Sequence, residues 1–374
     1  MGPPTAEPPR PRVATPGTSA GEVVSAPGRV NLIGDHTDYH GGLVLPMAVD
    51  RSCTVRWVPN GGDRVRVRSE GMEGRVDVAA DGSDDPDQVD PPWGRFPAGV
   101  LRALAGRGRA PAGFDADISS DVPVGSGLSS SSALSVAFTL AAAGAGGLPI
   151  GTVEVARAAL EGEVLATGVP GGLMDQLTAL WGVAGHALLI DCRELSARAV
   201  PLPESVAVLV AHCGVPRTLA GSAYAQRRAA GEATARSLGL ASLRDATAEQ
   251  VAHDPIARHV VAENARVAAF ADALPSGELG VLGALMLESH ASLRDDYRVS
   301  IPELDALVDA FVEEGAAGAR LTGAGFGGCV VAIAAAPSGQ AVLDRATERY
   351  RASTGREPRG FVARAVDGAR PLGA

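Results

Sequence analysis

A Gly/Ser-rich segment, Val124 to Ser132, stands between an expected strand and an expected helix and constrains the fold more than any other stretch. Alternating apolar and polar residues at 114–118 predict the strand, and a run of small residues at 129–143 predicts the helix. Glycines let a backbone approach a ligand closely, and free amides at a helix N-terminus bind phosphate, with serine hydroxyls as further donors or a Mg²⁺ ligand. A flexible linker is the alternative, which the flanking elements disfavour. The segment therefore indicates a phosphate-binding strand–helix junction.

The chain has no lysine, because each of its 33 basic residues is an arginine. A Walker A loop, a protein-kinase strand lysine and a Schiff-base lysine are therefore excluded. Any phosphate site must then use backbone amides, serines and arginines. The formal net charge of −10 also argues against nucleic acid or an anionic membrane as the main partner.

Nothing in the sequence predicts export or membrane insertion. Residues 1–20 are rich in proline and are expected to be disordered, without the apolar core of a signal peptide. Arginine, aspartate or glycine interrupts every apolar run, which argues against a membrane span. The four cysteines are far apart in sequence and form no CxxC pair, which favours reduced thiols over disulfides or a zinc site: Cys53, Cys192, Cys213 and Cys329. We expect a soluble cytoplasmic protein.

Strand and helix patterns in both halves predict an α+β fold. Strands are expected at 22–33, 43–49, 53–58, 64–78, 114–118, 187–191, 206–211 and 329–334, and helices at 96–104, 129–143 and 152–166. Ser300 and Glu303 predict a capping box at the start of a later helix. Prolines bracket a polar hinge at 201–204. We therefore expect a tail at 1–20, an N-terminal domain at 21–203 and a C-terminal domain at 204–374.

A second segment, Arg29 to Gly42, carries more hydrogen-bonding side chains than a turn between two strands requires. They include Asp35, His36, Asp38 and Tyr39. Recognition of a polyol needs carboxylate acceptors and fixed donors, because every hydroxyl both donates and accepts. An ordinary polar loop is one alternative. A metal site using His36 and Asp38 is another, although no third close ligand is evident.

A third segment, Leu321 to Cys329, contains a GxGxGG pattern. It is not a dinucleotide-binding fingerprint, because an apolar strand follows where that motif requires a helix. Taken alone, the pattern fits a tight hairpin turn as well as a ligand-binding loop.

Together, and in this order, the three segments resemble the GHMP kinase superfamily and, within it, the galactokinases. The stretch from Ala26 to Gly42, APGRVNLIGDHTDYHGG, is close to the galactokinase signature. Further similar stretches are 169–176, 221–228 and 289–297, so the resemblance covers roughly residues 22–365. It implies two α+β domains with the active site between them. The N-terminal domain would resemble domain 2 of ribosomal protein S5, and the C-terminal domain would be ferredoxin-like.

The resemblance also implies ATP-dependent phosphorylation of a small sugar, D-galactose above all, at its anomeric hydroxyl. Asp175 matches the base, Arg29 the arginine that stabilises the reacting oxygens, and Ser131 with Glu163 the Mg²⁺-binding pair. Sugar hydroxyls would be contacted by Asp35, His36, Asp38, Gly172 and Tyr224. The nucleotide would be bound by Gly125, Ser126, Gly127, Leu128, Ser129, Ser130, Ser131, Gly323 and Gly325. ATP and Mg²⁺ are thus the implied cofactors, and the family suggests a monomer.

Three positions depart from the galactokinase pattern: Asp35 replaces Glu, His40 replaces Asn, and Gly171 replaces a frequent Cys. The family's glutamate reaches the distal end of the sugar near its C6 hydroxyl, and Asp35 is one methylene shorter. Water could fill the gap, or the substrate could be a larger, C6-extended sugar. An N-acetylgalactosamine kinase and a non-catalytic sugar sensor are further alternatives, and the intact serines at 129–132 argue against the sensor.

Overall fold

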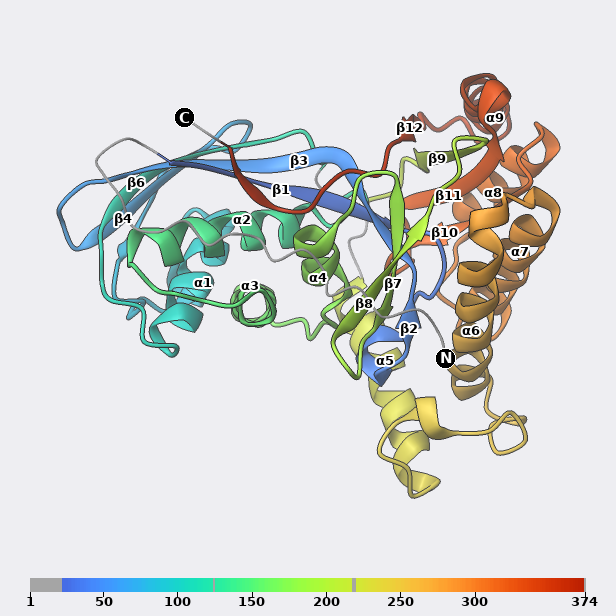
Figure 1. The fold of residues 1–374 in the computed structure, drawn as a ribbon, viewed down its shortest axis with the longest axis horizontal. Helices are drawn as coiled ribbons and strands as arrows, with labels where there is room; N and C mark the ends of the chain where they lie inside the picture. Colours follow the sequence, from blue (N-terminus) through green and yellow to red (C-terminus); the bar gives the residue numbers. More distant parts are fainter. Residues whose placement is uncertain (1–21, 124, 217–219, 373–374) are drawn as a thin grey trace.

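The computed structural model describes residues 22–123, 125–216 and 220–372 (Figure 1). The predicted disordered tail at 1–20 lies outside this part of the chain. The described residues form three β-sheets and the helices that pack against them. None of the described helices is long and apolar enough to cross a bilayer.

The largest sheet has six strands, and its spatial order is β13 (Arg370–Leu372), β1 (Glu22–Asn31), β3 (Pro46–Pro59), β6 (Phe114–Ser120), β4 (Arg64–Ser69) and β5 (Val76–Ala79). Neighbouring strands are antiparallel, except that β4 and β6 are parallel. In β4, Val65 and Val67 are buried while the arginines that alternate with them are not. This alternation is what a sheet with one covered face requires.

The single strand expected at 64–78 is wrong in extent, because two strands occupy that range. Strand β4 ends at Ser69 and β5 begins at Val76. Between them, Gly71 and Gly74 have φ angles of +77° and +83°. Glycine adopts these angles without a Cβ clash, so the chain can turn back at this point.

Four helices cover one face of the six-stranded sheet (Figure 1): α1 (Arg95–Ala105), α2 (Ser130–Ala145), α3 (Thr152–Thr167) and α4 (Met174–Trp181). Small residues bring these helices very close together. A Cβ added at Gly99 of α1 would lie 2.3 Å from the carbonyl oxygen of Gly162 in α3. Helices α2 and α4 both contact β1, and each carries residues that reach the site described below.

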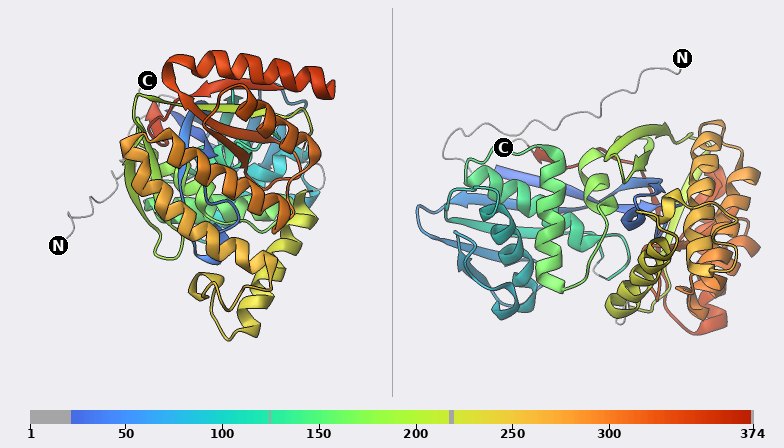
Figure 2. Two further views of the ribbon diagram at one scale, coloured as in Figure 1. Left: turned by 90° about the vertical axis from the view of Figure 1, so that its right-hand side faces the viewer. Right: turned by 90° about the horizontal axis from the view of Figure 1, so that it is seen from below.

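A second, four-stranded antiparallel sheet has the order β10 (Gly318–Thr322), β11 (Cys329–Ala335), β9 (Val206–His212) and β12 (Arg359–Ala363). Its helices form an outer layer (Figure 2): α6 (Pro255–Ala273), α7 (Leu279–Asp295), α8 (Pro302–Glu313) and α9 (Gly339–Thr354). Alternate residues of β9 belong to two different cores. Val208 packs with the first sheet and its helices, whereas Leu209 packs with α8 and α9.

The remaining elements connect these layers. A three-stranded sheet has the order β2 (Leu43–Val44), β7 (His186–Asp191) and β8 (Ser196–Pro201). Helix α5 (Ala220–Ser237) lies between β9 and α6 in sequence. Short 3₁₀ helices occupy Asp38–His40, Pro86–Gln88, Pro92–Gly94, Leu243–Asp245, Leu274–Ser276 and Ala336–Ser338.

The predicted capping box at Ser300 and Glu303 is not formed. Helix α8 begins at Pro302, and its N-cap residue is Ile301, which makes no side-chain capping bond. The Ser300 hydroxyl donates instead to the Asp305 carboxylate at 2.5 Å. Proline favours the first position of a helix, so Pro302 sets the start and leaves Ser300 one residue too early to cap it.

The predicted domain boundary at 203/204 stays a prediction. The chain crosses between the layers more than once, because β13, close to the C-terminus, pairs with β1 in the six-stranded sheet. Helix and strand are mixed in both halves, as expected for an α+β chain.

A fully buried arginine joins the loop after β1 to the second sheet. Arg320 of β10 has no exposed side-chain surface. Its Nη2 lies 2.7 Å from the Asp35 carboxylate, and its Nη1 donates to the Leu32 carbonyl at 3.2 Å. Since a buried charge is tolerated only with compensating partners, this contact ties the two segments together.

Glu263 of α6 completes the charge cluster beside Arg320, at 3.7 Å from its guanidinium. The Glu263 carboxylate accepts hydrogen bonds from the Gly34 amide at 2.9 Å, the Ser289 hydroxyl at 2.6 Å and the Arg266 guanidinium at 2.7 Å. Burial alone would raise its pKa, but the nearby positive charges, Arg320 foremost, lower the pKa of Glu263 to about 2. Glu263 is therefore ionised in the folded protein at neutral pH.

Replacing Arg320 should destabilise the protein strongly. In Arg320→Met the carboxylates of Asp35 and Glu263 stay buried without their shared cation, at an expected cost of about 3–5 kcal/mol in the free energy of unfolding. Arg345→Met is the matched control, because Arg345 is half exposed and pairs with Glu314 at 3.0 Å. Losing that surface pair should cost under about 1 kcal/mol. Urea unfolding measures both, and equal values would contradict the structural role of Arg320.

Candidate active site

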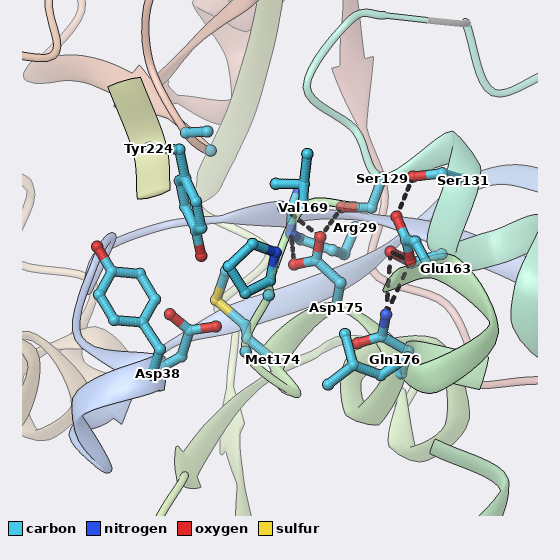
Figure 3. Close-up of a pocket in the computed structure, with 18 of the residues that line it drawn as sticks. Arg29, Asp38, Ser129, Ser131, Glu163, Val169, Met174, Asp175, Gln176 and Tyr224 are labelled. Atoms are coloured by element: carbon cyan, nitrogen blue, oxygen red, sulfur yellow. Dashed lines mark hydrogen bonds and ion pairs between the residues drawn. The ribbon is translucent and has the colours of Figure 1, made fainter. Parts of the chain in front are cut away.

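A cavity of about 380 Å³ lies where β1, α2, α3, α4 and α5 meet the loop after β10. Its volume falls in the range of small-molecule sites. In Figure 3 its lining residues fall into two groups, called compartments below: Asp38 and Tyr224 stand on one side, Ser131 and Glu163 on the other, and Asp175 lies between them. The predicted residues that line it are Arg29, Asp35, His36, Asp38, Gly125, Ser129, Ser131, Glu163, Gly172, Asp175, Tyr224 and Gly323.

Arg29 and Asp175 form a two-point ion pair at the centre of the cavity. The Arg29 Nε lies 2.7 Å from Asp175 Oδ1, and its Nη2 lies 2.8 Å from Oδ2. The Arg29 side chain is 5% exposed, whereas that of Asp175 is 25% exposed. The guanidinium is thus covered by protein while the carboxylate still faces the cavity. Paired N–H donors also fix the plane of the carboxylate, as a bidentate contact does.

The position of Arg29 follows from an irregularity in β1. The pairing of β1 with β3 changes register between Pro27 and Arg29. A Cβ at Gly28 would lie 2.7 Å from the Leu128 carbonyl oxygen, so only glycine lets the strand approach the Gly/Ser segment this closely. The Arg29 amide donates to Leu128 O at 3.1 Å, and its Nη1 donates to Gly127 O at 2.5 Å. The strand and the Gly/Ser segment are therefore held together by Arg29.

Ser129 is bound to Asp175 and not to the helix that it precedes. It is the N-cap residue of α2 with a left-handed φ of +58°, and its side chain makes no capping bond. Its hydroxyl donates to Asp175 Oδ2. A left-handed conformation is uncommon for a residue with a Cβ, and strained residues of this kind are enriched at functional sites. Asp175, in the first turn of α4, thereby accepts bonds from both β1 and the start of α2.

Glu163 of α3 is surrounded by neutral donors. Its carboxylate accepts from the Ser131 hydroxyl at 2.5 Å, the Ser132 hydroxyl at 3.0 Å and the Gln176 amide at 2.9 Å. Burial raises the pKa of Glu163, and the charge of nearby Asp175 adds to the rise. Within the described ranges no cation contacts this carboxylate. A bound cation would supply the missing positive charge.

The oxygen atoms of Ser131 and Glu163 are the hard ligands that Mg²⁺ prefers. No group of three or more His, Cys, Asp or Glu in the described part of the chain could hold a metal ion alone. Mg²⁺ typically uses one or two carboxylates and completes its shell with water and substrate phosphates. The donor set therefore fits Mg²⁺ bound together with a phosphate ligand.

The other compartment is lined by polar and aromatic groups around Asp38. Burial raises the pKa of Asp38 to about 7, and the neighbouring charge of Asp175 contributes. Burial likewise raises the pKa of Tyr224 well above 10, so its hydroxyl keeps its proton as a donor. The alternative metal site at His36 and Asp38 is not favoured, because no group of three or more His, Cys, Asp or Glu among the described residues could hold a metal ion there.

Asp35 lies at the edge of this compartment with both carboxylate oxygens already bonded. Oδ2 accepts from Arg320 and Oδ1 accepts from the Gly323 amide at 3.0 Å. Several predicted nucleotide residues do not line the cavity: Ser126, Gly127, Leu128, Ser130 and Gly325. Their nucleotide-binding role stays a prediction.

Sequence reasoning gave no role to Gln176 or Thr167, which also line the cavity, and it named Tyr39 and Ser132 only as members of the polar loop and of the Gly/Ser-rich segment. Gln176 directly follows Asp175 and donates to Glu163, so it links the two carboxylates of the site. Its adjacency to Asp175 was the only signal available. Nothing local in the sequence indicates that Glu163, thirteen residues earlier, would be its partner.

The sequence is related to known kinases along most of its length. Residues 14–57 match the galactokinase galactose-binding signature, and residues 95–183 and 270–352 match the GHMP kinases N terminal domain and the GHMP kinases C terminal. The galactokinases of Roseiflexus sp. (strain RS-1) and Chloroflexus aurantiacus are each 44% identical to it, over 92% of this chain and 92% of their own. The chain belongs to the galactokinase family of GHMP kinases.

Solved structures share the fold of this galactokinase-family chain. A Lactococcus lactis galactokinase complexed with galactose aligns with a TM-score of 0.88 and 31% identity, over 95% of this chain and 96% of that one. Methanococcus jannaschii mevalonate kinase aligns with a TM-score of 0.68 over 94% and 100%, and its 18% identity shows the fold alone. The two-domain α+β GHMP fold and the sugar-kinase class expected from the sequence are confirmed.

Gly172 should be essential because Asp38 occupies the space beside it. A Cβ at position 172 would lie 1.8 Å from Asp38 Oδ2, whereas one at Gly171 would meet only Leu160 Cδ1, at 3.2 Å. Gly172→Ala must displace the carboxylate by about 1 Å or more, so sugar-kinase kcat/KM should fall about 100-fold. Gly171→Ala is the matched control and should stay near the wild-type value. Steady-state kinetics decide, and equal values for the two variants would contradict the assignment.

Because the pKa of Asp38 is raised, the free energy of unfolding should fall as the pH rises above 4. Between its ordinary pKa of 3.8 and about 7, the unfolded chain loses the Asp38 proton while the folded chain keeps it. Stability therefore falls with pH across this window and levels off above it. Asp38→Asn removes the titration, so the variant should gain about 2–4 kcal/mol relative to wild type between pH 4 and pH 8.

Denaturant unfolding at several pH values measures this gain. Asp117→Asn, an exchange at an exposed position of β6, is the control and should show no such pH-dependent gain. A difference between Asp38→Asn and wild type that is constant from pH 4 to pH 8 would contradict the pKa assigned to Asp38.

Proposed function

We propose that this protein transfers the γ-phosphoryl group of ATP to the anomeric hydroxyl of D-galactose, giving galactose 1-phosphate and ADP. The observation that carries this proposal is the Arg29–Asp175 pair. It lies where the compartment around Asp38, whose groups suit a polyol, meets the serine-lined compartment. The galactokinase relatives, and the Lactococcus lactis galactokinase complexed with galactose, support D-galactose as the sugar.

The compartment around Asp38 has the groups that a sugar needs. Asp38 supplies carboxylate oxygens as acceptors, and the Tyr224 hydroxyl supplies a donor. His36, Tyr39 and Tyr224 bring their rings within 6.0 Å of one another, which gives the apolar ring faces of a sugar a surface to pack on. Binding would thus combine hydrogen bonds to hydroxyls with contact to C–H groups.

The serine-lined compartment would hold the phosphates without lysine. Helix α2 begins at Ser130, so the amides of its first turn and the positive end of its dipole lie next to Ser129 and Ser131. Gly125 has a φ of +70° and open space around its Cβ position, which leaves room for a ligand against the backbone. Backbone amides and hydroxyls would replace the missing ammonium group.

Ser131 and Glu163 would hold the Mg²⁺ ion. When bound, Mg²⁺ neutralises charge on the phosphate oxygens. Ser132 and Gln176 hold one oxygen of Glu163, and Ser131 is bonded to the other. These contacts fix the carboxylate before the ion arrives, so little reorganisation is needed.

Asp175 would accept the proton of the anomeric hydroxyl. As that oxygen forms its bond to the γ-phosphorus, the bond from phosphorus to the β-phosphate bridging oxygen breaks, and ADP leaves. Phosphoryl transfer has a loose transition state, so positioning and charge stabilisation provide most of the rate. Arg29 orients the Asp175 carboxylate with two hydrogen bonds and brings a positive charge to the reaction centre.

The alternative of a C6-extended sugar depends on the shorter side chain of Asp35. Its carboxylate is bonded to Arg320 and to the Gly323 amide, which leaves few lone pairs for a substrate. Comparing kcat/KM for D-galactose, its C6-extended analogues and the N-acetyl sugar separates these possibilities.

Asp175→Asn and Arg29→Ala should each reduce kcat by about 10²–10⁴, because the first removes the base and the second removes its orienting partner. ATP binding should be nearly unchanged in both, since the α2 N-terminus and Ser131 are intact. ADP release with D-galactose, identification of the 1-phosphate product and calorimetric titration with a non-hydrolysable ATP analogue measure these outcomes. A kcat near wild type in either variant, or no galactose 1-phosphate from the wild-type enzyme, would refute the proposal.

A further inference from the structure

A hydrogen-bonded chain leads from the cavity to Tyr297, two residues after the end of α7. The Tyr39 hydroxyl lies 2.7 Å from His36 Nδ1 and 2.8 Å from the Tyr297 hydroxyl. The His36 side chain is almost fully buried, and Tyr297 is completely buried. Tyr297 is 258 residues from Tyr39 in sequence, so the chain joins two distant segments.

His36 is held in an unusual backbone conformation beside these tyrosines. Its φ is +67°, in the left-handed region that a residue with a Cβ seldom adopts. Its ring centroid lies 4.7 Å from that of Tyr297, with the two planes tilted by 36°. This ring contact fixes the plane of the imidazole. The question that remains is which of its two nitrogens carries the proton.

The number of hydrogens that His36, Tyr39 and Tyr297 can donate decides which nitrogen is protonated. Burial lowers the pKa of His36 well below its usual value, so the ring is neutral and has one donor and one acceptor nitrogen. Among the described residues, the Tyr297 hydroxyl has no hydrogen-bond partner besides Tyr39. Each hydroxyl can donate only one hydrogen, so the chain has just two possible directions.

In one direction His36 Nδ1–H donates to Tyr39, and Tyr39 donates to Tyr297. The hydroxyl hydrogen of Tyr297 is then buried without an acceptor, and His36 Nε2 is a buried acceptor without a donor. In the other direction Tyr297 donates to Tyr39, and Tyr39 donates to His36 Nδ1. Every hydroxyl hydrogen is then used, and the donor left over is the N–H on Nε2, which has the Ala324 backbone as a partner. In the first direction the donor left over is the Tyr297 hydroxyl, which has no acceptor among the described residues. Since an unmade buried hydrogen bond is costly, the second direction is favoured.

The second direction places the proton of His36 on Nε2. That atom is buried and has no well-formed hydrogen bond, although the backbone of Ala324 interacts with the His36 ring. Both His36 and Ala324 line the cavity. An N–H at this position requires an acceptor, and a sugar oxygen would provide one.

We propose that Tyr297 is a positioning residue, which acts through Tyr39 to hold His36 as the Nε2–H tautomer and so presents an N–H donor to the substrate. The inference rests on the proposed function, because it takes the acceptor to be a sugar oxygen. Without Tyr297, the Tyr39 hydrogen is free to leave His36, and both tautomers become accessible. Without the Tyr39 hydroxyl, no donor is bonded to the lone pair on His36 Nδ1.

Phenylalanine variants test the proposal because they remove only hydroxyl groups. Tyr297→Phe should raise the KM for D-galactose about three- to tenfold, the effect of one weakened hydrogen bond. Tyr39→Phe should raise it at least as much. In both, kcat and the KM for ATP should change little, because Asp175 and the α2 N-terminus are untouched.

Tyr350→Phe is the matched control. Tyr350 is also fully buried, and its hydroxyl donates to the Cys213 carbonyl at 2.7 Å, away from the cavity. It should lose a comparable amount of stability while the KM for the sugar stays at the wild-type value. If Tyr297→Phe and Tyr350→Phe show the same KM, Tyr297 has a structural role only, and the proposal is overturned.

A spectroscopic readout separates this proposal from the proposed function. Long-range ¹H–¹⁵N correlation spectra of the histidine side chains report which nitrogen carries the proton. The His36 signals are identified by their absence in His36→Gln. Wild type should show a protonated Nε2, and Tyr39→Phe a mixture of tautomers. A protonated Nδ1 in wild type overturns the inference even if the enzyme phosphorylates galactose, and failure to phosphorylate galactose leaves the tautomer result standing.

Discussion

The contact on which the site depends is the buried cluster of Arg320, Asp35 and Glu263. Each charge in it is buried and must keep its partner, so the loop after β1 cannot move independently of α6 and β10. Gly34 donates to Glu263, and Gly323 donates to Asp35. One cluster thus sets the position of the polar segment from Asp35 to Tyr39 and of the glycine-rich loop after β10.

Besides Asp35, three carboxylates line the cavity, and the structure treats each one differently. Asp175 has a bidentate arginine, Glu163 has only neutral donors, and Asp38 lies beside Asp175 with a raised pKa. Groups placed in this way store unfavourable electrostatic energy that a bound cation and a bound sugar would relieve. Such arrangements are typical of active sites, where stability is exchanged for pre-organised charge.

Much of the fold was predictable because its determinants are local. The alternation of Val65 and Val67 with arginines, and the strand–Gly/Ser–helix junction before α2, depend on periodicity that can be read within a short window. The errors were local too. Two glycines divided a predicted strand, and Pro302 moved a helix start past Ser300. In both cases a single backbone preference overrode a side-chain pattern.

The sequence alone determined the chemical inventory: a phosphate-binding junction without lysine, a polar loop suited to a polyol, and segments that resemble those of galactokinases. Only the tertiary structure decided which groups meet. Arg29 pairs with a carboxylate 146 residues away, Tyr39 with a hydroxyl 258 residues away, and Arg320 with a carboxylate 285 residues away. Side-chain periodicity reports only which face of an element is buried, whereas the choice of a distant partner depends on the path of the whole chain.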